Sequence, residues 1–267
     1  MPTFKITLAY DGTDYVGWQR QAGGVSIQAL IEEAAGELDE GAVVVTGAGR
    51  TDAGVHAAGQ VASFSIRRAI GAQALVRALN ARLPGAVRVL AAQEVPAIFH
   101  PRFQARTKTY RYRIWNGEVL SPFERRYVWH VVRALDVGAM AAAAHLLEGR
   151  HDFAAFQAAG GRPHSSERVI FSSKISIPQD PARALLEPPS LRAGGIIVYE
   201  ISGSGFLRHM VRTIVGTLVE VGCGRRAPEW VGDVLASRDR GKAGPTAPAT
   251  GLVLTSVEYD SVLAADS

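Results

Sequence analysis

A β-strand is encoded by residues 4–10, Phe4-Lys5-Ile6-Thr7-Leu8-Ala9-Tyr10, where apolar side chains alternate with polar or small ones. Successive side chains of a strand point to opposite faces, so this alternation predicts a strand with one buried face. The turn residues Asp11-Gly12-Thr13 end it. Strand-like sequence begins almost at once, and we expect no signal peptide, because an apolar core and a cleavage site are both missing.

Five further elements are expected in the first hundred residues. Ser26 is the expected N-cap of a helix whose apolar positions, from Ile27 to Leu38, follow helical spacing. The order of all six elements is β-α-β-β-α-β. The later ones are a strand at Ala42–Val45, a strand at Val55–Ile66, a helix from Ile70 to Leu83 and a strand at Val87–Val95.

The second half of the chain predicts a similar mixture of strands and helices. Strands are expected at Thr107–Trp115, Val169–Ile177, Ile196–Ser202 and Leu252–Tyr259, and helices at Asp136–Leu147, Gly205–Val221 and Pro228–Ser237. Residues 157–167 and 178–195 are expected to be loops, and the tail after Asp260 to be frayed. The fold class is therefore α+β with two halves, and we expect domains at residues 1–103 and 104–267.

Composition excludes several classes of protein. Hydrophobic residues make up 47% and charged residues 20% of the 267 residues, which is typical of a packed globular chain rather than a disordered one. No apolar run approaches the roughly 20 residues that a membrane span needs. The single cysteine, Cys223, cannot form an internal disulfide and argues against a cysteine-based metal site. We therefore expect a cytoplasmic protein without membrane contact or bound metal.

Positive charge is concentrated in one stretch. The net charge is +4, but residues 102–133 hold eight lysines or arginines against two glutamates, a local charge of +6. The remainder of the chain nets −2. Such a focused basic stretch suits a polyanionic partner, although basic charge alone does not separate nucleic acid from an anionic membrane.

The glycine-rich segment from Gly47 to Gly54 is a candidate site for chemistry. It begins like a phosphate-binding loop, but its third glycine is misplaced, and strand-like sequence rather than a helix follows it. A nucleotide-binding enzyme is therefore a weak interpretation. The segment holds Asp52, with Arg50 two residues before it; a loop aspartate is ordinarily a turn residue that bonds its own backbone.

The residues on either side of Asp52 in the sequence favour a different interpretation. The nine residues Gly49-Arg50-Thr51-Asp52-Ala53-Gly54-Val55-His56-Ala57 resemble the signature of the TruA family of tRNA pseudouridine synthases. The resemblance extends over nearly the whole chain. It includes residues 9–13, 17–19, 99–103, 108–112, 205–212 and 247–252.

The resemblance implies isomerisation of uridine to pseudouridine at nucleotides 38, 39 and 40 in the anticodon stem-loop of tRNA, without cofactor or metal. Asp52 matches the family's catalytic aspartate. A carboxylate suits the reaction because it can attack C1′ or C6 covalently while the uracil detaches and turns over. A uridine in a stem-loop must also flip out of the stack to reach a buried carboxylate.

The resemblance also implies partners for Asp52. Arg208 matches the arginine that pairs with the aspartate, and its alternative role is a phosphate contact. Tyr110 matches the pocket tyrosine, whose ring packs on the target base and whose hydroxyl could assist loss of the C5 proton. Both residues belong to the second half and Asp52 to the first. The resemblance implies two RRM-like or ferredoxin-like halves in a pseudosymmetric, largely antiparallel sheet, with helices on one face and a catalytic cleft between the halves.

Four further residues are candidates for substrate binding. The resemblance favours Arg50 as the residue that occupies the space of the flipped base, against a phosphate contact or an ion pair with Asp52. Leu252 resembles an apolar pocket wall, and core packing is equally compatible with its position. Arg111 is either a phosphate contact or solvated, and Arg102 lies at the start of the basic stretch.

Two more expectations concern assembly and the main alternative. The family implies a homodimer, which fits the limited basic surface that one protomer offers to a whole tRNA. The alternative to an enzyme is a noncatalytic RNA-binding module, because sheet aromatics can stack bases. That alternative lacks the usual aromatic RNP motif and leaves Asp52 unexplained.

Overall fold

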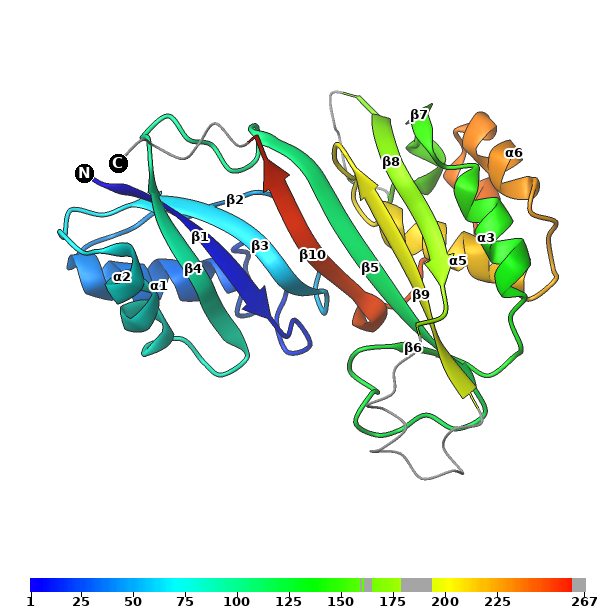
Figure 1. Cartoon of the computed structure of the whole chain (residues 1–267), viewed down its shortest axis with the longest axis horizontal. Coiled ribbons are helices and arrows are strands. Elements are labelled where there is room, and N and C mark those ends of the chain that lie inside the picture. Colours follow the sequence, from blue (N-terminus) through cyan, green and yellow to red (C-terminus); the bar gives the residue numbers. More distant parts are fainter. Residues whose placement is uncertain (159, 161–164, 179–193, 261–267) are drawn as a thin grey trace. The chain divides into compact units, whose positions relative to one another are not determined.

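A computed structural model describes residues 1–158, 160, 165–178 and 194–260. The chain divides into two compact units, each described here by itself. Unit 1 comprises Met1–Lys108 with Val253–Ser267, and unit 2 comprises Thr109–Leu252. The fold is mixed α/β with mostly antiparallel strand pairing, in agreement with the expected class. Its elements are labelled in Figure 1.

Unit 1 has the expected β-α-β-β-α-β order, to which the last strand of the chain is added. Its sheet has the strand order β4-β1-β3-β10, and β2 also pairs with β3. All pairs are antiparallel except β3 with β10. The elements are β1 (Thr3–Tyr10), α1 (Ile27–Asp39), β2 (Thr46–Gly47), β3 (His56–Ser65), α2 (Ala72–Asn80), β4 (Val87–Val95) and β10 (Leu252–Tyr259).

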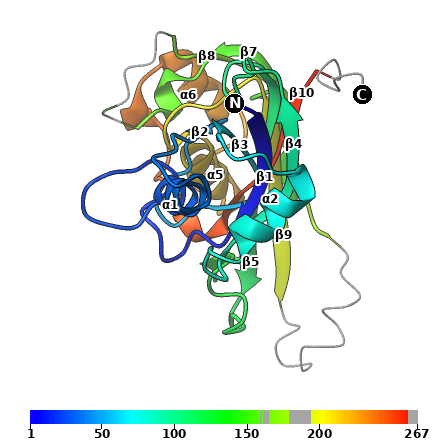
Figure 2. The same ribbon diagram turned by 90° about the vertical axis from the view of Figure 1, so that its left-hand side faces the viewer.

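The core of unit 1 lies between one face of this sheet and its two helices (Figures 1 and 2). Phe4, Ile6 and Leu8 of β1 are buried, whereas the residues between them are partly exposed. Helix α1 begins where the sequence predicts, because the Ser26 hydroxyl accepts a hydrogen bond from the Ala29 N–H. The predicted alternation and cap are thus confirmed.

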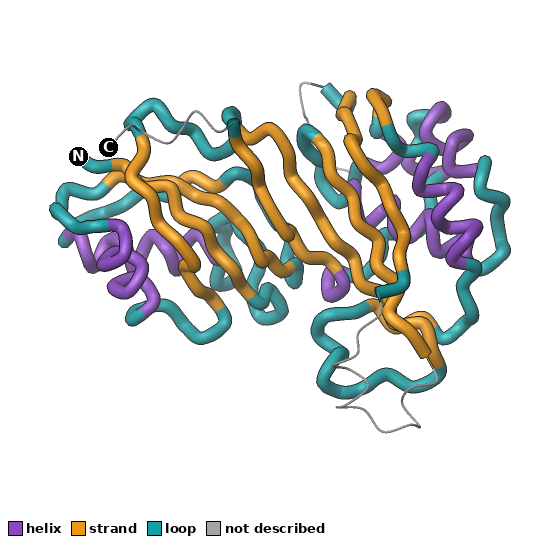
Figure 3. Tube along the Cα trace, in the orientation of Figure 1, coloured by secondary structure: helices purple, strands orange, loops and turns teal. Residues whose placement is uncertain are grey.

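Unit 2 is built around strands in the order β5-β9-β8-β7, with β6 paired in parallel with β5. Figure 3 shows its strands and helices in separate colours. Helix α5 is the central helix, and its residues are almost all buried. The elements are β5 (Ala105–Gly117), β6 (Trp129–Val131), α3 (Val137–His145), β7 (Gly149–Asp152), β8 (Glu167–Ser176), β9 (Gly194–Gly203), α5 (Met210–Gly222) and α6 (Trp230–Ser237), with short 3₁₀ turns at Ala154–Phe156, Arg240–Lys242 and Ala249–Gly251.

The strand predicted at Ala42–Val45 is wrong. These residues precede the two-residue strand β2 and belong to no strand themselves. Side chains of helix α1 form hydrogen bonds with the backbone of Val45 instead. The Val45 carbonyl accepts from Gln28 Nε2 at 3.0 Å, and the Val45 N–H donates to Glu32 Oε1 at 3.2 Å. A neighbouring strand is therefore not needed to satisfy these groups.

The helix predicted from Gly205 begins later, at Met210. His209 lies just before it with φ of +59°, in the left-handed region that a right-handed helix cannot include. Arg208 consequently belongs to the connection between β9 and α5 rather than to the helix. The short strands β6 and β7 were not predicted at all, because three or four residues carry too little periodicity.

The compact units differ from the predicted domains in two respects. The first unit continues to Lys108, beyond the expected boundary at residue 103, and β10 belongs with it rather than with the second half. Strand β10 joins unit 1 because Val253 and Leu254 pair with His56 and Ala57 of β3. Such a pairing across about 200 residues of sequence leaves no local signal.

Some expectations concern residues that the structure describes only in part. The expected loop at 157–167 is described only in part, most of the expected loop at 178–195 lies outside the described residues, and so does the expected frayed tail. Within the described part of the chain, no helix is long and apolar enough to cross a membrane. The same part contains no group of three or more His, Cys, Asp or Glu residues placed to hold a metal ion.

Candidate active site

Asp52 lies on a loop that connects β2 with β3 in unit 1. We call residues 47–54 the Asp52 loop. Strand β2 pairs with the later part of β3, so the chain leaves the sheet after Gly47 and returns to it at His56. Asp52 is half-buried, and Arg50 beside it is exposed. The two residues that the sequence assigns to this segment therefore lie on the same short loop.

Backbone hydrogen bonds fix the Asp52 loop to its surroundings. The Ala48 N–H donates to Val61 O at 2.8 Å, which holds the start of the loop against β3. The Trp18 N–H donates to Thr51 O at 3.0 Å, immediately before Asp52. The Val55 N–H donates to Asp52 O at 3.1 Å, which closes a turn after it. The backbone of Asp52 is thus held on both sides.

Side chains from neighbouring strands also hold the Asp52 loop. Gln60 of β3, which is fully buried, donates from Nε2 to Gly49 O at 3.0 Å and to the Tyr10 hydroxyl at 3.4 Å. The Tyr10 hydroxyl lies 2.9 Å from Thr51 Oγ1. Lys108 Nζ donates to Ala48 O at 2.7 Å. Three of the loop residues are therefore bonded to side chains from β1, β3 and the start of β5.

Two glycines let the segment after β1 approach the Asp52 loop closely. A Cβ atom on Gly12 would lie 2.0 Å from Val55 O, and one on Gly17 would lie 2.5 Å from Thr51 O. Gly17 also has φ of +100°, which favours glycine. No side chain fits at either position without displacing the loop backbone. The segment after β1 therefore packs directly against the backbone around Asp52.

Burial raises the pKa of Tyr10 to about 12, against the opposing effect of its hydrogen bonds to Thr51 and Gln60. The Tyr10 hydroxyl therefore keeps its proton at neutral pH. Because the Gln60 amide nitrogen can only donate, the Tyr10 oxygen accepts from it and has its own proton available for Thr51.

Tyr110 and Arg208 both belong to unit 2. Tyr110 lies on β5 and is buried, with its ring 5.1 Å from that of Phe206 in an edge-to-face arrangement. Arg208 is exposed two residues further along the same connection, where its carbonyl accepts a hydrogen bond from the Ala158 N–H. Phe206 thus links Tyr110 to the segment that carries Arg208.

The remaining candidates have diverse surroundings. In unit 2, Arg111 is exposed and forms an ion pair with Glu200, with Nη2 2.8 Å from Oε2. Leu252 is buried, and the segment before it is fixed by a hydrogen bond from the Tyr112 hydroxyl to Pro248 O. In unit 1, exposed Arg102 has its guanidinium 5.8 Å from the ring of Phe103. Arg111 therefore already has a carboxylate partner, and the burial of Leu252 is compatible with both a pocket wall and core packing.

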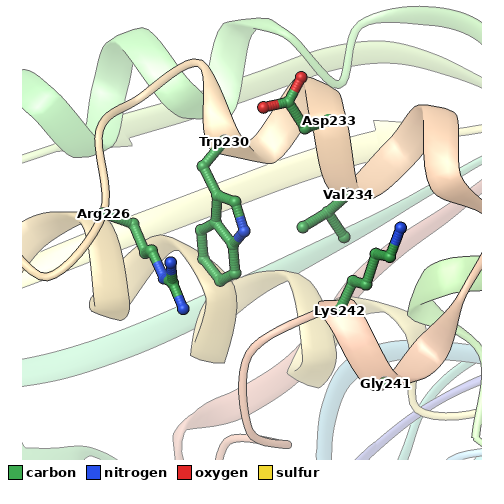
Figure 4. A pocket seen from close by; sticks show the side chains of 6 residues that line it. All are labelled: Arg226, Trp230, Asp233, Val234, Gly241 and Lys242. Carbon is green, nitrogen blue, oxygen red and sulfur yellow. The ribbon is translucent and has the colours of Figure 1, made fainter.

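An open depression on unit 2 carries none of the predicted site residues (Figure 4). It is lined by residues of α6 and of the 3₁₀ turn after it. Trp230 stands between Arg226 and Lys242, and the Arg226 guanidinium lies 5.1 Å from its ring centre. The Trp230 ring in this depression therefore already has a cationic neighbour from the protein itself, the Arg226 side chain.

Comparison with known proteins identifies the family. The family model for tRNA pseudouridine synthases matches residues 6–104 and 143–260. The chain is 48% identical to tRNA pseudouridine synthase A of Myxococcus xanthus, over 97% of this chain and 92% of that protein. It is 46% identical to the protein of the same name from Moorella thermoacetica, over 97% of this chain and all of that protein. The chain belongs to the tRNA pseudouridine synthase family.

Membership makes the protein an isomerase that forms pseudouridine in tRNA, as the resemblance implied. Both matched segments contain residues predicted for the synthase site: Asp52 lies in the first, and Arg208 in the second. The matched region after residue 104 resumes only at residue 143, so Tyr110 and Arg111 lie outside it.

Sequence reasoning missed the residues that hold the Asp52 loop of this synthase. Gln60 lay unnoticed inside a strand predicted from its apolar neighbours. One signal was available in the sequence: Gln60 shares the period-two register of the apolar residues Ala62 and Phe64. The structure buries all three residues on the side of β3 that faces the core. A polar side chain in a buried position needs partners, and here those partners belong to the candidate site.

Proposed function

We propose that this synthase isomerises uridine at nucleotides 38, 39 and 40 in the anticodon stem-loop of tRNA, with Asp52 as nucleophile. The observation that carries the proposal is the fixed backbone on both sides of Asp52, inside the segment that resembles the family signature. A half-buried carboxylate on a fixed loop is placed to attack a base that has flipped out of the stack.

The proposed reaction breaks one glycosidic bond and forms another. The carboxylate of Asp52 attacks either C1′ of the ribose or C6 of the base, and the C1′–N1 bond breaks. The uracil turns over in place, C5 bonds to C1′, and the adduct with Asp52 is released. C5 loses its proton and N1 gains one, so the product has the same atoms and charge as uridine and no cofactor is consumed.

Tyr110 and Arg208 are proposed to complete this site from unit 2. The Tyr110 ring packs on the uracil, and its hydroxyl assists removal of the C5 proton. The guanidinium of Arg208 pairs with Asp52 and keeps the carboxylate ionised in a site that excludes water. Tyr110→Phe keeps the ring and removes the hydroxyl, so an unchanged rate of tritium release from C5 would exclude the proton-transfer role.

This arrangement requires the two units to act together. We propose that they are RRM-like or ferredoxin-like halves related by pseudosymmetry, with the target uridine held in a cleft between them. The sheet order β4-β1-β3-β2 in unit 1 supports this, because it is the order of that fold. An experimental structure of the tRNA complex in which Asp52, Tyr110 and Arg208 lay apart would contradict it.

Arg50, Leu252 and Arg102 are proposed to bind the substrate with these groups. Arg50 occupies the space of the flipped base, Leu252 lines the pocket, and Arg102 contacts phosphate. Arg111 is already paired with Glu200, so a phosphate would have to compete with that carboxylate. We therefore expect Arg111→Ala to reduce the salt dependence of tRNA binding less than Arg102→Ala does. The opposite order would argue for a direct phosphate contact by Arg111.

A symmetric homodimer in the cytoplasm is the proposed working form. Two protomers offer twice the basic surface of one, which a chain of net charge +4 needs to hold a whole tRNA. Sedimentation at assay concentrations tests this proposal. A monomer with full activity would refute it.

The central experiment replaces Asp52. Asp52→Asn keeps the size of the side chain and removes the nucleophile, so it should bind tRNA normally and release no tritium from C5-labelled uridine. Because the reaction leaves the mass unchanged, pseudouridine-specific carbodiimide adducts provide the second measurement. A variant that forms pseudouridine at the normal rate would exclude Asp52 as nucleophile.

A further inference from the structure

Three buried polar residues form one continuous chain of hydrogen bonds that ends in the Asp52 loop. It runs from the amide of Gln60 in β3, through the hydroxyl of Tyr10 at the end of β1, to the hydroxyl of Thr51 beside Asp52. All three residues are buried, with exposed fractions of 0% for Gln60, 4% for Tyr10 and 6% for Thr51. Burying a polar group costs folding free energy unless the group is hydrogen-bonded. A buried chain of three such residues therefore needs a structural or functional reason.

The sheet itself does not need this chain. Gln60 opposes Leu8 on the core-facing side of β3, where an apolar residue would pack without any requirement for partners. Its Oε1 accepts from the Val61 N–H at 3.1 Å, which leaves both amide hydrogens for Gly49 O and Tyr10. Both of those contacts lead towards the Asp52 loop, directly or through one further residue.

A bulge in the sheet brings Tyr10 and Gln60 together. The register of β1 and β3 shifts between Leu8 and Tyr10, which face Gln60 and Ala57 respectively. Bulges redirect side chains next to functional sites. Here the shift lies at the end of β1 that adjoins the loop, where β1 and β3 run side by side (Figure 1).

We infer that Tyr10, Thr51 and Gln60 are positioning residues, whose hydrogen-bond chain fixes the backbone beside Asp52 so that the carboxylate meets the uridine in a reactive geometry. This inference rests on the proposed role of Asp52 as nucleophile. The chain holds the loop at Gly49 and Thr51, on the N-terminal side of Asp52, and the Val55 N–H holds the carbonyl of Asp52 itself.

The physical reason for such a device is the sensitivity of covalent attack to distance. A displacement of about 1 Å at the reacting atoms costs roughly 10²-fold in rate, because the reactive conformer is then rarely populated. A short glycine-rich loop would sample such displacements if only its ends were held. Positioning groups of this kind affect the chemical step more than the binding of the substrate.

The experiment compares Tyr10→Phe with Tyr199→Phe. Both variants remove one buried hydroxyl: Tyr10 lies 2.9 Å from Thr51 Oγ1, and Tyr199 lies 2.9 Å from Ser173 Oγ in unit 2, outside the proposed machinery. Single-turnover rates, Kd for tRNA and thermal midpoints are measured well below the melting temperature. We expect Tyr10→Phe to slow the chemical step by about 10- to 100-fold with unchanged Kd, and Tyr199→Phe to leave the rate unchanged.

Two variants of Thr51 test the other end of the chain. Thr51→Val removes the hydroxyl and should lower the single-turnover rate as Tyr10→Phe does, so it also serves if Tyr10→Phe does not fold. Thr51→Ser keeps the hydroxyl and should restore most of the rate. Equal rates for Thr51→Val and Thr51→Ser, or a Tyr10→Phe rate no lower than that of Tyr199→Phe, would overturn the inference.

Asp52→Asn is assayed in parallel to separate the two proposals. If Asp52→Asn forms pseudouridine, the proposed nucleophile is wrong whatever the Tyr10 variants do. If Asp52→Asn is inactive while Tyr10→Phe and Thr51→Val keep the full rate, Asp52 remains the nucleophile and only the positioning role fails. A slow Tyr10→Phe with the pH dependence of the unmodified enzyme supports positioning, because the phenol that it removes has a pKa of about 12 and keeps its proton near neutral pH.

Discussion

Each unit contains a buried tyrosine whose hydroxyl lies 2.9 Å from a neighbouring hydroxyl, and the two contacts differ in what they join. Tyr199 of β9 contacts Ser173 of β8, and these strands already pair along their length. Tyr10 of β1 contacts Thr51, which lies on a loop. The contact between Tyr199 and Ser173 joins two strands that the sheet already holds together. The contact between Tyr10 and Thr51 ties a loop to a strand. The same chemistry therefore has a structural use in unit 2 and a functional one in unit 1.

The largest effect is expected from closing the space beside the Asp52 loop. In Gly12→Ala the new Cβ would lie 2.0 Å from Val55 O, and in Gly216→Ala of helix α5 it would lie 1.7 Å from Pro245 O. Both substitutions force backbone apart, which costs about 3 kcal/mol of unfolding free energy. Urea unfolding measures this loss. Only Gly12→Ala should also lower kcat of the folded enzyme, because its clash is with Val55, the residue directly after the Asp52 loop, whose N–H bonds the Asp52 carbonyl.

A Gly12→Ala enzyme with normal kcat would break the comparison between the units. It would mean that the Asp52 loop tolerates displacement and that its many anchors serve stability alone. Assays well below the unfolding midpoint are needed, so that a smaller folded fraction is not mistaken for a slower enzyme.

Local sequence predicted the regular elements better than their surroundings. The ranges of β4 and β10 agree with the predictions at both ends, since alternating side chains and flanking turn residues mark them. The prediction at Ala42–Val45 failed because side chains of α1, distant in sequence, satisfy the Val45 backbone. The return of β10 to β3 likewise depends on partners that no local pattern specifies.

In the candidate site, too, features with a local sequence pattern were predicted, whereas features that depend on tertiary contacts were not. Asp52, Tyr110 and Arg208 were proposed because they match a family signature, and their roles stay predictions. The roles of Gln60 and Tyr10 as anchors of the Asp52 loop could not be predicted, because alternating strand sequence by itself predicts only sheet packing for both residues. Their function depends on a bulge and a shared loop, which are properties of the folded chain.

Alkaline titration gives a smaller effect that the two tyrosines should share. Burial raises the pKa of Tyr10 to about 12 and raises that of Tyr199 as well. Above pH 10 the unfolded chain loses phenolic protons that the folded chain keeps, so stability falls as the pH rises from 10 towards the folded pKa. Tyr10→Phe should remove about 2 kcal/mol of this loss by pH 12.

The measurement is urea unfolding between pH 8 and pH 12. Each Phe variant should be less stable than the parent enzyme at pH 8, where a hydrogen bond has been lost, and should recover relative to it as the pH rises. A stability difference independent of pH would show that the buried hydroxyl titrates normally. Up to pH 9 the Tyr10 proton stays in place, so its titration should contribute no change to kcat in that range.

The smallest effect, and the sharpest test of the comparison, is the coupling within each pair. Tyr10→Phe with Thr51→Val and Tyr199→Phe with Ser173→Ala form two double-mutant cycles around contacts of equal length. In unfolding free energy both pairs should couple by about 1 kcal/mol, since each loses one buried hydrogen bond. In kcat only the first pair should couple, because its two residues act on the same loop. Coupling of Tyr199 and Ser173 in kcat would show that rigidity anywhere in the fold limits the rate, and the distinction between the two contacts would disappear.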